Sequence, residues 1–513
     1  MKKTVVILML LTILSKILGF GRDIFLSYFY GASNISDIYL ISLTIPTVII
    51  AILGKGISAG FVPMYTRIEQ RDGIEEANQY TNNVINFVIL FCTLIFILGL
   101  VFTESIVKLF ASGFTGETLD LTITFSRITL IGVYFIGLNY VYTAYLQIKG
   151  VFVIPTLMGL PANILMIASI FLSIHTNIYT LSIGSLIALF SQFLLLLIFG
   201  YKSNYRYKYN LDYKDEKIRK MFILALPAIL GTSVAQINLL IDRSLASQIV
   251  VGGITALKYS STLSGVIIGI FVLSISSVLY PKISKICAEN KMEELKSVLS
   301  SATGAINLLV IPAIVGLLIF AEPFVELLFG RGQFDSKAIA MTSSALFFYA
   351  IGLIGLSHRE ILTNTFYSLQ DTKTPMINAA TAMGLNIVLN FVLSSFLGIS
   401  GLALATSISA IFCTILLLIN LRRKIGHLGL KNMAYTFIKI LFASLAMGGI
   451  SKLIYDFLLN ELGLIFSLMI SICSGALVYF ILIYYMKIKE IDLVIIELRN
   501  KLNMKKEKKE RVS

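Results

Sequence analysis

Charged side chains are scarce in this chain: Lys, Arg, Asp and Glu together make up only 14% of its 513 residues. Hydrophobic residues make up 57%, and the mean hydropathy is +0.87. A soluble protein of this size needs far more polar surface to cover its core. The composition therefore excludes a soluble globular protein and indicates a polytopic, all-α membrane protein.

Cysteine and histidine are also few. The four cysteines are far apart in the sequence and show neither metal-ligand spacing nor a disulfide framework. The three histidines, His175, His358 and His427, are isolated, and no set of a nucleophile and a base is evident. The sequence therefore predicts a protein that is not an enzyme and has no organic cofactor.

Fourteen apolar runs are long enough to cross a bilayer. Their approximate limits are 5–29, 36–65, 82–103, 121–148, 152–173, 178–200, 219–249, 255–280, 299–320, 338–368, 375–397, 400–421, 433–455 and 462–487. The connections alternate between basic and nearly free of Lys and Arg, so the positive-inside rule predicts that both termini are cytoplasmic. The first run is too long for a signal peptide and lacks a small-residue cleavage site, so we expect a retained helix.

The Lys and Arg residues behind the net charge of +14 lie mainly in every second connection between the apolar runs. The basic connections, including the Lys-rich tail, lie along the inner leaflet, where they meet anionic lipids. This placement disfavours binding to nucleic acid, because the charge sets the topology of the helices instead of forming a basic patch on one domain.

An internal repeat relates the two halves of the chain. Asn163 follows Gln147 by sixteen residues, and Asn386 follows Gln370 by the same interval. The offset of about 220 residues spans an even number of crossings, which predicts two six-helix lobes in parallel repeat, with two helices appended. The alternative is that the halves share only hydrophobic periodicity. The predicted parts are an N-terminal lobe at 1–203, a cytoplasmic linker at 204–218, a C-terminal lobe at 219–424, the two further helices at 425–490 and a basic tail at 491–513.

Several charged residues lie inside runs that otherwise read as membrane-spanning. A charge at the centre of a bilayer costs roughly 2.5–3.5 kcal/mol, so such charges usually face a cavity or a partner. Arg22 and Asp23 lie in the first helix, two turns after Lys16, and Lys55 lies in the second helix between two glycines. We expect these residues to face a polar cavity, where the planar fork of Arg22 suits a diphosphate or carboxylate.

Other interpretations of the charged residues stay open. One alternative is that Arg22 and Asp23 form a structural ion pair that locks the first helix to a neighbour. Asp37 begins the second helix, where a role as a helix cap or dipole partner competes with a gating role. Lys258 begins the eighth helix and either faces the cavity or snorkels to the outer interface. Arg359 and Glu360 lie in the tenth helix and are expected to face the bundle interior.

A second set of polar residues has the chemistry of a cation site. Asp242 is a single carboxylate in the seventh helix. Asn386 and Asn390 share a face of the eleventh helix, and Leu402 and Thr406 have the same spacing on the twelfth. Oxygen donors with one negative charge suit a hard monovalent cation such as Na⁺. The alternative is that the amides and hydroxyl only bridge helices, with Asp242 neutralised by the arginine that follows it.

The sequence around these residues resembles the MurJ (MviN) family, the lipid II flippases of the multidrug/oligosaccharidyl-lipid/polysaccharide exporter superfamily. The resemblance covers essentially the whole chain and includes fourteen helices, where twelve are usual in the superfamily. It rests on three strings, Leu18-Gly19-Phe20-Gly21-Arg22-Asp23, Phe61-Val62-Pro63 and Phe366-Tyr367-Ser368-Leu369-Gln370-Asp371-Thr372-Lys373-Thr374-Pro375.

The resemblance implies roles for particular residues. Arg22 and Asp23 are expected to line a central cavity and to engage the lipid-linked diphosphate, and Asp37 matches a position implicated in function. The resemblance also implies a sodium site at Asp242, Asn386, Asn390, Leu402 and Thr406.

Two departures from the family pattern concern the charge of the cavity. An arginine expected in the second helix falls on Ile50 or Ala51, and another expected in the eighth falls on Thr262. Lys55 and Lys258 each lie about one turn away, so we expect lysines to replace the missing charge. Lysine is a point charge and holds a diphosphate less rigidly than arginine does.

The family implies that the chain moves lipid II, an undecaprenyl-diphosphate glycopeptide, from the inner to the outer leaflet of a bacterial cytoplasmic membrane. Alternating access, driven by the membrane potential and Na⁺, is the expected mechanism. The undecaprenyl tail is expected to stay in the lipid, along a groove that involves the two helices at 425–490. The expected partners are that lipid, anionic membrane lipids and cell-wall synthesis proteins. One alternative is a flippase for another polyprenyl-linked glycan, of the capsule, O-antigen or spore-cortex type. The other is a cation-coupled drug exporter, which a cleft lined by lysine and arginine disfavours.

Overall fold

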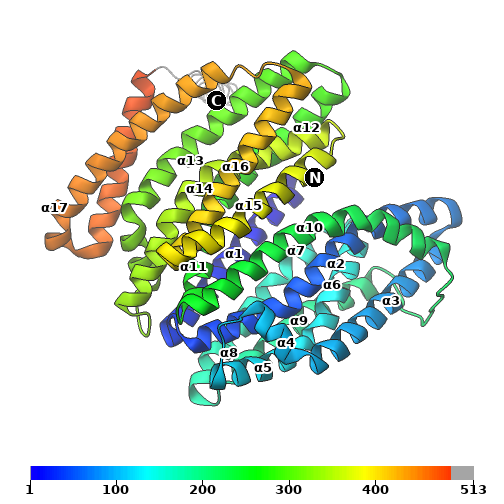
Figure 1. The fold of residues 1–513 in the computed structure, drawn as a ribbon. Coiled ribbons are helices and arrows are strands. Elements are labelled where there is room, and N and C mark those ends of the chain that lie inside the picture. The colour runs from blue at the N-terminus through cyan, green and yellow to red at the C-terminus, as the bar shows by residue number, and fades with distance from the viewer. Residues whose placement is uncertain (1, 487–513) are drawn as a thin grey trace, which may run out of the picture. The chain divides into compact units, whose positions relative to one another are not determined.

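The computed structural model describes residues 2–486, which form helices joined by short turns (Figure 1). No β-strand occurs among these residues, which confirms the predicted all-α class. The predicted basic tail at 491–513 lies outside them. The helices are α1 (Lys2–Tyr30), α2 (Asn34–Asp72), α3 (Ile74–Val101), α4 (Thr103–Phe110), α5 (Gly116–Leu130), α6 (Gly132–Ile148), α7 (Val153–Leu157), α8 (Gly159–His175), α9 (Thr180–Lys202), α10 (Glu216–Ile249), α11 (Gly253–Ile267), the π-helical turn η1 (Ile268–Val272), α12 (Leu273–Ala288), α13 (Met292–Phe329), α14 (Ser336–Ser368), α15 (Lys373–Leu397), α16 (Ile399–Ile425) and α17 (Leu430–Tyr485).

Twelve stretches of helix within the described residues are long and apolar enough to cross a membrane. The last of them, within α17, is counted once, although Gly463 breaks its helical geometry with a φ of 70° and a ψ of 175°. The second arm of α17 folds back there beside the first (Figure 1, orange and red). The predicted count of fourteen depends on this second arm and on α1, which is not among the twelve. That count and the orientation of the chain stay predictions.

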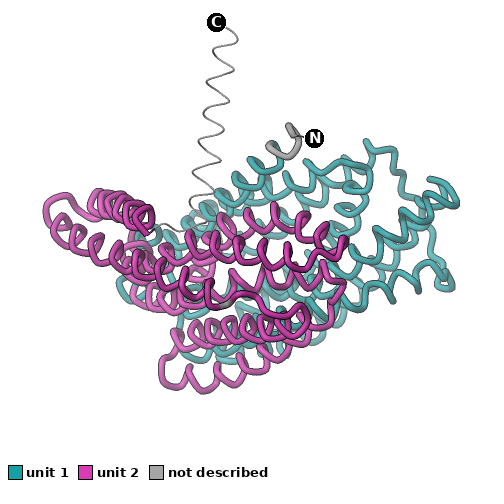
Figure 2. Tube along the Cα trace, turned by 90° about the horizontal axis from the view of Figure 1, so that it is seen from above, with its two compact units in different colours: residues 1–257, 328–339 teal, residues 258–327, 340–513 magenta. Residues whose placement is uncertain are grey.

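Contacts between helices divide the chain into two compact units, which Figure 2 shows in two colours. Unit 1 comprises Met1–Leu257 and Leu328–Ile339, and unit 2 comprises Lys258–Leu327 and Ala340–Ser513. The divisions fall inside α11, α13 and α14, so each of these helices contributes to both units. The predicted linker at 204–218 lies within unit 1, and the division into transport lobes stays a prediction.

In unit 1, α2 packs closely against α10 because glycines lie where the two helices meet. A Cβ atom added to Gly56 would lie 2.4 Å from a side-chain carbon of Ile229. One added to Gly60 would lie 2.5 Å from the carbonyl oxygen of Met221. Small residues four positions apart allow helix backbones to approach, which is a common way to join helices in a membrane.

The connection between α9 and α10 is bound along α3 by three buried asparagines, Asn82, Asn83 and Asn86. Asn83 Nδ2 donates to the carbonyl oxygen of Asp212 at 3.2 Å, and Asn83 Oδ1 accepts from the amide of the same residue at 3.0 Å. Asn86 Nδ2 donates to the carbonyl oxygen of Asn210 at 2.9 Å. The segment predicted as a linker is therefore an ordered part of unit 1.

In unit 2, the end of the string at 366–375 forms the turn between α14 and α15. Gln370 has a φ of 57°, in the left-handed region. Asp371 accepts from the amide and the hydroxyl of Thr374 at 3.0 and 2.9 Å, and from Lys424 Nζ at 2.6 Å. Burial raises the pKa of Asp371, but these partners outweigh it and hold the pKa at about 2. The motif thus ties the start of α15 to the end of α16.

Replacing Gly60 with alanine should destabilise the protein, because the new methyl group would overlap the main chain of α10. Overpacking of this kind costs about 1–3 kcal/mol. The matched control is Gly231→Ala on α10, where an added Cβ meets no atom within 4 Å and alanine favours the helix by up to about 1 kcal/mol. Thermal unfolding in detergent should give a lower midpoint for Gly60→Ala only. Equal midpoints would contradict the close contact of α2 with α10.

Candidate functional site

Arg22 and Asp23 form an ion pair on α1. Asp23 Oδ1 accepts from Arg22 Nη2 at 2.7 Å and from Nε at 3.1 Å. The aspartate side chain is 4% exposed, whereas the arginine side chain is 23% exposed. Arg22 Nη1 also lies 3.4 Å from the sulfur of Met166 in α8. The guanidinium is therefore held from its buried side, with part of its surface accessible.

Small residues position this pair by bringing α1 close to α8. A Cβ atom added to Gly159 would lie 2.3 Å from the Ser15 hydroxyl oxygen, and one added to Gly19 would lie 3.7 Å from the amide of Asn163. Asn163 Nδ2 donates to the carbonyl oxygen of Ser15 at 3.4 Å. The part of α1 that precedes Arg22 is thus fixed against the rest of unit 1.

The two lysines predicted to accompany Arg22 in unit 1 are both exposed, Lys16 on α1 and Lys55 on α2. The sequence around Lys55 explains its position. A Cβ atom added to the preceding Gly54 would overlap the ring of Tyr140 in α6, and the following glycine packs against α10. Because both neighbours of Lys55 face packed helices, its own side chain lies on the remaining, accessible face of α2.

Asp37 binds the N-terminus of another helix. The residue is only 1% exposed. Oδ2 accepts from the amide of Gly252 at 2.8 Å, and Oδ1 accepts from the amide and the hydroxyl of Thr255 at 2.8 and 2.6 Å. Gly252 directly precedes α11 and Thr255 lies in its first turn, where the dipole of the helix also favours a negative charge. The N-terminus of α2 itself is capped by Ser33, so Asp37 is a dipole partner for a distant helix.

The residue that precedes α11, Gly252, has to be glycine for this contact to form. Gly252 has a φ of 79°, and a Cβ atom there would lie 2.3 Å from the carbonyl oxygen of Ala32. Arg243 of α10 is 7% exposed and donates to the carbonyl oxygen of Ile254 at 3.4 Å. It also acts electrostatically on Asp37. The first turn of α11 is therefore held between a carboxylate and a guanidinium.

Four of the five predicted cation ligands lie together in unit 2. Asn390 Nδ2 donates to Asn386 Oδ1 at 2.9 Å, and Asn386 Nδ2 lies 3.5 Å from the hydroxyl oxygen of Thr406. That hydroxyl in turn donates to the carbonyl oxygen of Leu402 at 3.1 Å. Amide, hydroxyl and carbonyl oxygens in one cluster fit the ligand preferences of a hard monovalent cation. The fifth residue, Asp242, belongs to unit 1, where it accepts from a neighbouring asparagine side chain at 3.3 Å.

The remaining predicted substrate residues belong to unit 2. Lys258 is half-buried on α11, and Arg359 is exposed on α14, where it interacts with Cys413 of α16. The neighbour Glu360 accepts from Asn364 at 3.3 Å. The predicted substrate residues thus divide between the units: Lys16, Arg22, Asp23, Asp37 and Lys55 in unit 1, and Lys258 and Arg359 in unit 2.

The sequence did not reveal the partners of Asp37. Thr255 and Arg243 carry no local signal that connects them to a residue more than 200 positions earlier. The adjacent glycines at 252 and 253 do mark a turn, and a helix begins directly after it. That turn could have identified the helix N-terminus, but not the carboxylate that binds it.

Comparisons with known proteins give a consistent result. A family model described as "Lipid II flippase MurJ" matches residues 26–473. The probable lipid II flippase MurJ of Vibrio cholerae serotype O1 is 29% identical over 462 residues, which cover 87% of each chain. The corresponding protein of Thermotoga maritima is 28% identical over 487 residues, which cover 94% of this chain and 96% of the relative.

Solved structures agree with these relatives. A lipid II flippase MurJ in an inward closed conformation matches with a TM-score of 0.82 at 28% identity, over 95% of this chain and 100% of that one. An inward-facing multidrug resistance transporter of the MATE family, in the MOP superfamily, matches with a TM-score of 0.70 at 16% identity, over 82% and 98%. The second likeness establishes a common fold only.

Replacing Asp37 with alanine should loosen the first turn of α11. The amides of Gly252 and Thr255 would lose their shared acceptor, and hydrogen bonds to a charged group contribute about 1.5–3 kcal/mol. We expect hydrogen exchange of a peptide covering 250–258 to accelerate by roughly tenfold or more. Asp371→Ala removes a carboxylate that binds the first turn of a helix in unit 2, so it should leave this peptide unchanged. Unaltered exchange in Asp37→Ala would show that the contact is absent in solution.

Proposed function

Because the chain belongs to the MurJ family of lipid II flippases, we propose that it carries lipid II from the inner to the outer leaflet of the bacterial cytoplasmic membrane. The ion pair on α1 is the observation that carries this proposal. A guanidinium whose orientation is fixed by a buried carboxylate, and which keeps part of its surface accessible, suits recognition of a diphosphate. Arg22 is therefore assigned to the diphosphate of the lipid, and Asp23 to positioning Arg22.

A site for a diphosphate needs more positive charge than Arg22 supplies. Arg22 and Asp23 together are formally neutral, whereas a diphosphate is strongly anionic. Lys16 and Lys55 are exposed, and neither belongs to the ion pairs found among residues 2–486. We assign these two lysines to the diphosphate as well, in place of the arginines that the family pattern places nearby. Lys258 and Arg359 are the further candidates, from unit 2.

The direction of transport follows from the charge of the substrate. Moving two negative charges outward across 100 mV, inside negative, releases about 4.6 kcal/mol. In the proposed cycle the two repeats rock to expose the diphosphate first to one side and then to the other. In this cycle we assign a gating role to Asp37, whose contact with the start of α11 would have to break before the starts of α2 and α11 could separate.

Na⁺ is the proposed coupling ion. The oxygen atoms of Asn386, Asn390, Leu402 and Thr406 would hold it, and Asp242 would supply the one negative charge. The first four residues cluster in unit 2, which supports this assignment, because neutral oxygen atoms of this kind are ligands that a hard cation prefers. Inward movement of Na⁺ would then favour return of the empty carrier.

A flippase for another polyprenyl-linked glycan uses the same chemistry at the diphosphate and differs only in the sugar. Direct binding of the purified protein to lipid II and to other undecaprenyl-diphosphate lipids separates these two functions. A preference for lipid II supports the proposal, and a preference for a lipid with another glycan replaces it. The exposed lysines disfavour the third candidate, an exporter of cationic drugs.

Arg22→Ala should reduce lipid II flipping by purified protein in liposomes roughly 10-fold to 100-fold, because a charge-assisted hydrogen bond contributes about 1.5–3 kcal/mol. The chain offers a matched control in Arg71, which also pairs with the aspartate that follows it, at 2.9 Å. That pair lies exposed at the end of α2, so Arg71→Ala should flip at the normal rate. Full activity of a folded Arg22→Ala variant would remove the assignment.

Na⁺ should raise the thermal midpoint of the protein when it replaces K⁺ at constant ionic strength, because a bound ion stabilises the folded state. Asp242→Asn and Asn386→Ala should each abolish this shift. Asn420→Ala is the control, since Asn420 also joins α15 and α16 through an amide, to Asn378 at 3.0 Å. It should lower the midpoint without removing the response to Na⁺. A normal Na⁺ shift in both site variants would exclude the cluster as the binding site.

A further inference from the structure

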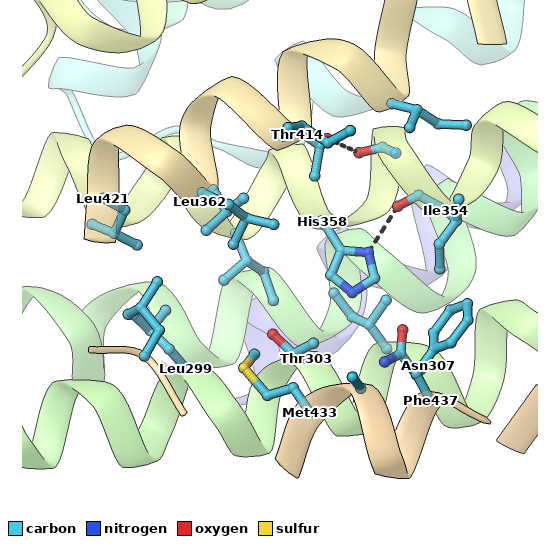
Figure 3. Close-up of a pocket in the computed structure, with 18 residues that line it drawn as sticks. Leu299, Thr303, Asn307, Ile354, His358, Leu362, Thr414, Leu421, Met433 and Phe437 are labelled. Atoms are coloured by element: carbon cyan, nitrogen blue, oxygen red, sulfur yellow. Dashed lines mark hydrogen bonds between the residues drawn. The ribbon is translucent and has the colours of Figure 1, made fainter. Parts of the chain in front are cut away.

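Unit 2 contains a largely apolar, partly open pocket of about 390 Å³, lined mainly by α13, α14, α16 and the first arm of α17 (Figure 3). Its walls include Leu299, Leu362, Leu421, Met433 and Phe437. Pockets that bind small molecules typically measure about 300–1,000 Å³ and combine apolar walls with a few polar groups. The size and the lining of this pocket fall within that description.

Four polar side chains interrupt the apolar wall: Thr303, Asn307, His358 and Thr414, the last of which donates to the carbonyl oxygen of Gly355 at 2.7 Å. Asn307 is 2% exposed, and its Oδ1 has no hydrogen-bond partner among residues 2–486. His358 Nδ1 lies 2.8 Å from the carbonyl oxygen of Ile354. A carbonyl oxygen only accepts, so Nδ1 carries the proton of the neutral ring and Nε2 is an acceptor. The wall therefore presents acceptors that require a donor.

Asn307 and His358 lie at one end of the pocket. Along α13, Leu299 and Asn307 are eight positions apart, which corresponds to about 12 Å. Figure 3 shows Leu299 and Leu421 on one side of the pocket, and Asn307 and His358 on the other. The pocket thus has an apolar end and a polar end, with Thr303 between them.

Water alone does not match this pattern. A water molecule occupies about 30 Å³ and needs two to four polar partners. Apolar walls around most of the volume cannot supply such partners. A guest with a hydrocarbon body and one donor group matches both parts of the pocket.

We propose that this pocket binds a neutral lipid alcohol. The hydroxyl group of the alcohol donates to Asn307 Oδ1 at the polar end, and its aliphatic chain lies along Leu299 and Leu421. No charged side chain is among the lining residues, which disfavours a lipid with a charged head. Met433 and Phe437 belong to the first arm of α17, so the bound alcohol joins this arm to the other helices of the pocket.

The chain contains no tryptophan, so a single introduced tryptophan reports on its own surroundings. Phe437→Trp places the reporter in the pocket wall. Phe442→Trp lies on the same arm at a site that is 62% exposed, where it reports on the surrounding detergent. The probe is a brominated long-chain alcohol, which quenches fluorescence on contact, and its methyl ether is the donor-free control.

The alcohol should quench Phe437→Trp saturably, at concentrations at least about tenfold lower than the ether requires, because only the alcohol satisfies Asn307. Both compounds should quench Phe442→Trp equally and without saturation. Adding Asn307→Leu to Phe437→Trp should remove the preference for the alcohol. Equal quenching by the two compounds at Phe437→Trp, or a preference that survives Asn307→Leu, would overturn the proposal.

The wild-type protein gives a second measurement, which does not depend on how the variants fold. The alcohol should raise its thermal midpoint, and the ether should not. Identical midpoints with the two compounds would also overturn the proposal. Neither experiment involves transport, so its outcome is independent of the function assigned to Arg22.

Discussion

Hydrocarbon offers no hydrogen bonds, so every polar group inside a spanning helix has to be bound by another part of the protein. In this chain that requirement decides which helix segments meet. The carboxylate of Asp37 fixes the start of α11 beside the start of α2. The amides of Asn386 and Asn390 bind each other on α15, and a hydroxyl of α16 lies beside them. The contacts of Asp37, Asn386 and Asn390 are thus ones that a hydrocarbon environment favours.

The sequence predicted contacts within one helix better than contacts between distant ones. Arg22 and Asp23 are neighbours in the chain, and the spacing of Asn386 and Asn390 places them on one helical face, so local geometry was enough for both pairs. The partners of Asp37 lie more than 200 residues away, and helix periodicity carries no information about such a distance. The sequence also did not reveal how the segment at 204–218 is bound, because several of its hydrogen bonds use its main chain, which looks the same in every sequence.

Residues at matching positions of the predicted repeat make different contacts. Asn163 follows Gln147 as Asn386 follows Gln370, yet Asn163 binds the main chain of α1 from α8. Asn386 instead belongs to a cluster of amide and hydroxyl groups on α15 and α16. The same side chain therefore packs against a main chain in one half of the sequence and contacts polar side chains in the other.

The asparagines of α3 grip the neighbouring segment mainly through its peptide groups, at Lys208, Asn210 and Asp212. The route of that segment is consequently encoded largely in a remote helix, although the hydroxyl groups of Tyr205 and Tyr207 also donate to Asn82 and Asn86. Side chains of the segment that make no such bond can be exchanged without redirecting the polypeptide. Proline at Asp212 is the instructive exception, since it would delete the amide hydrogen that Asn83 receives.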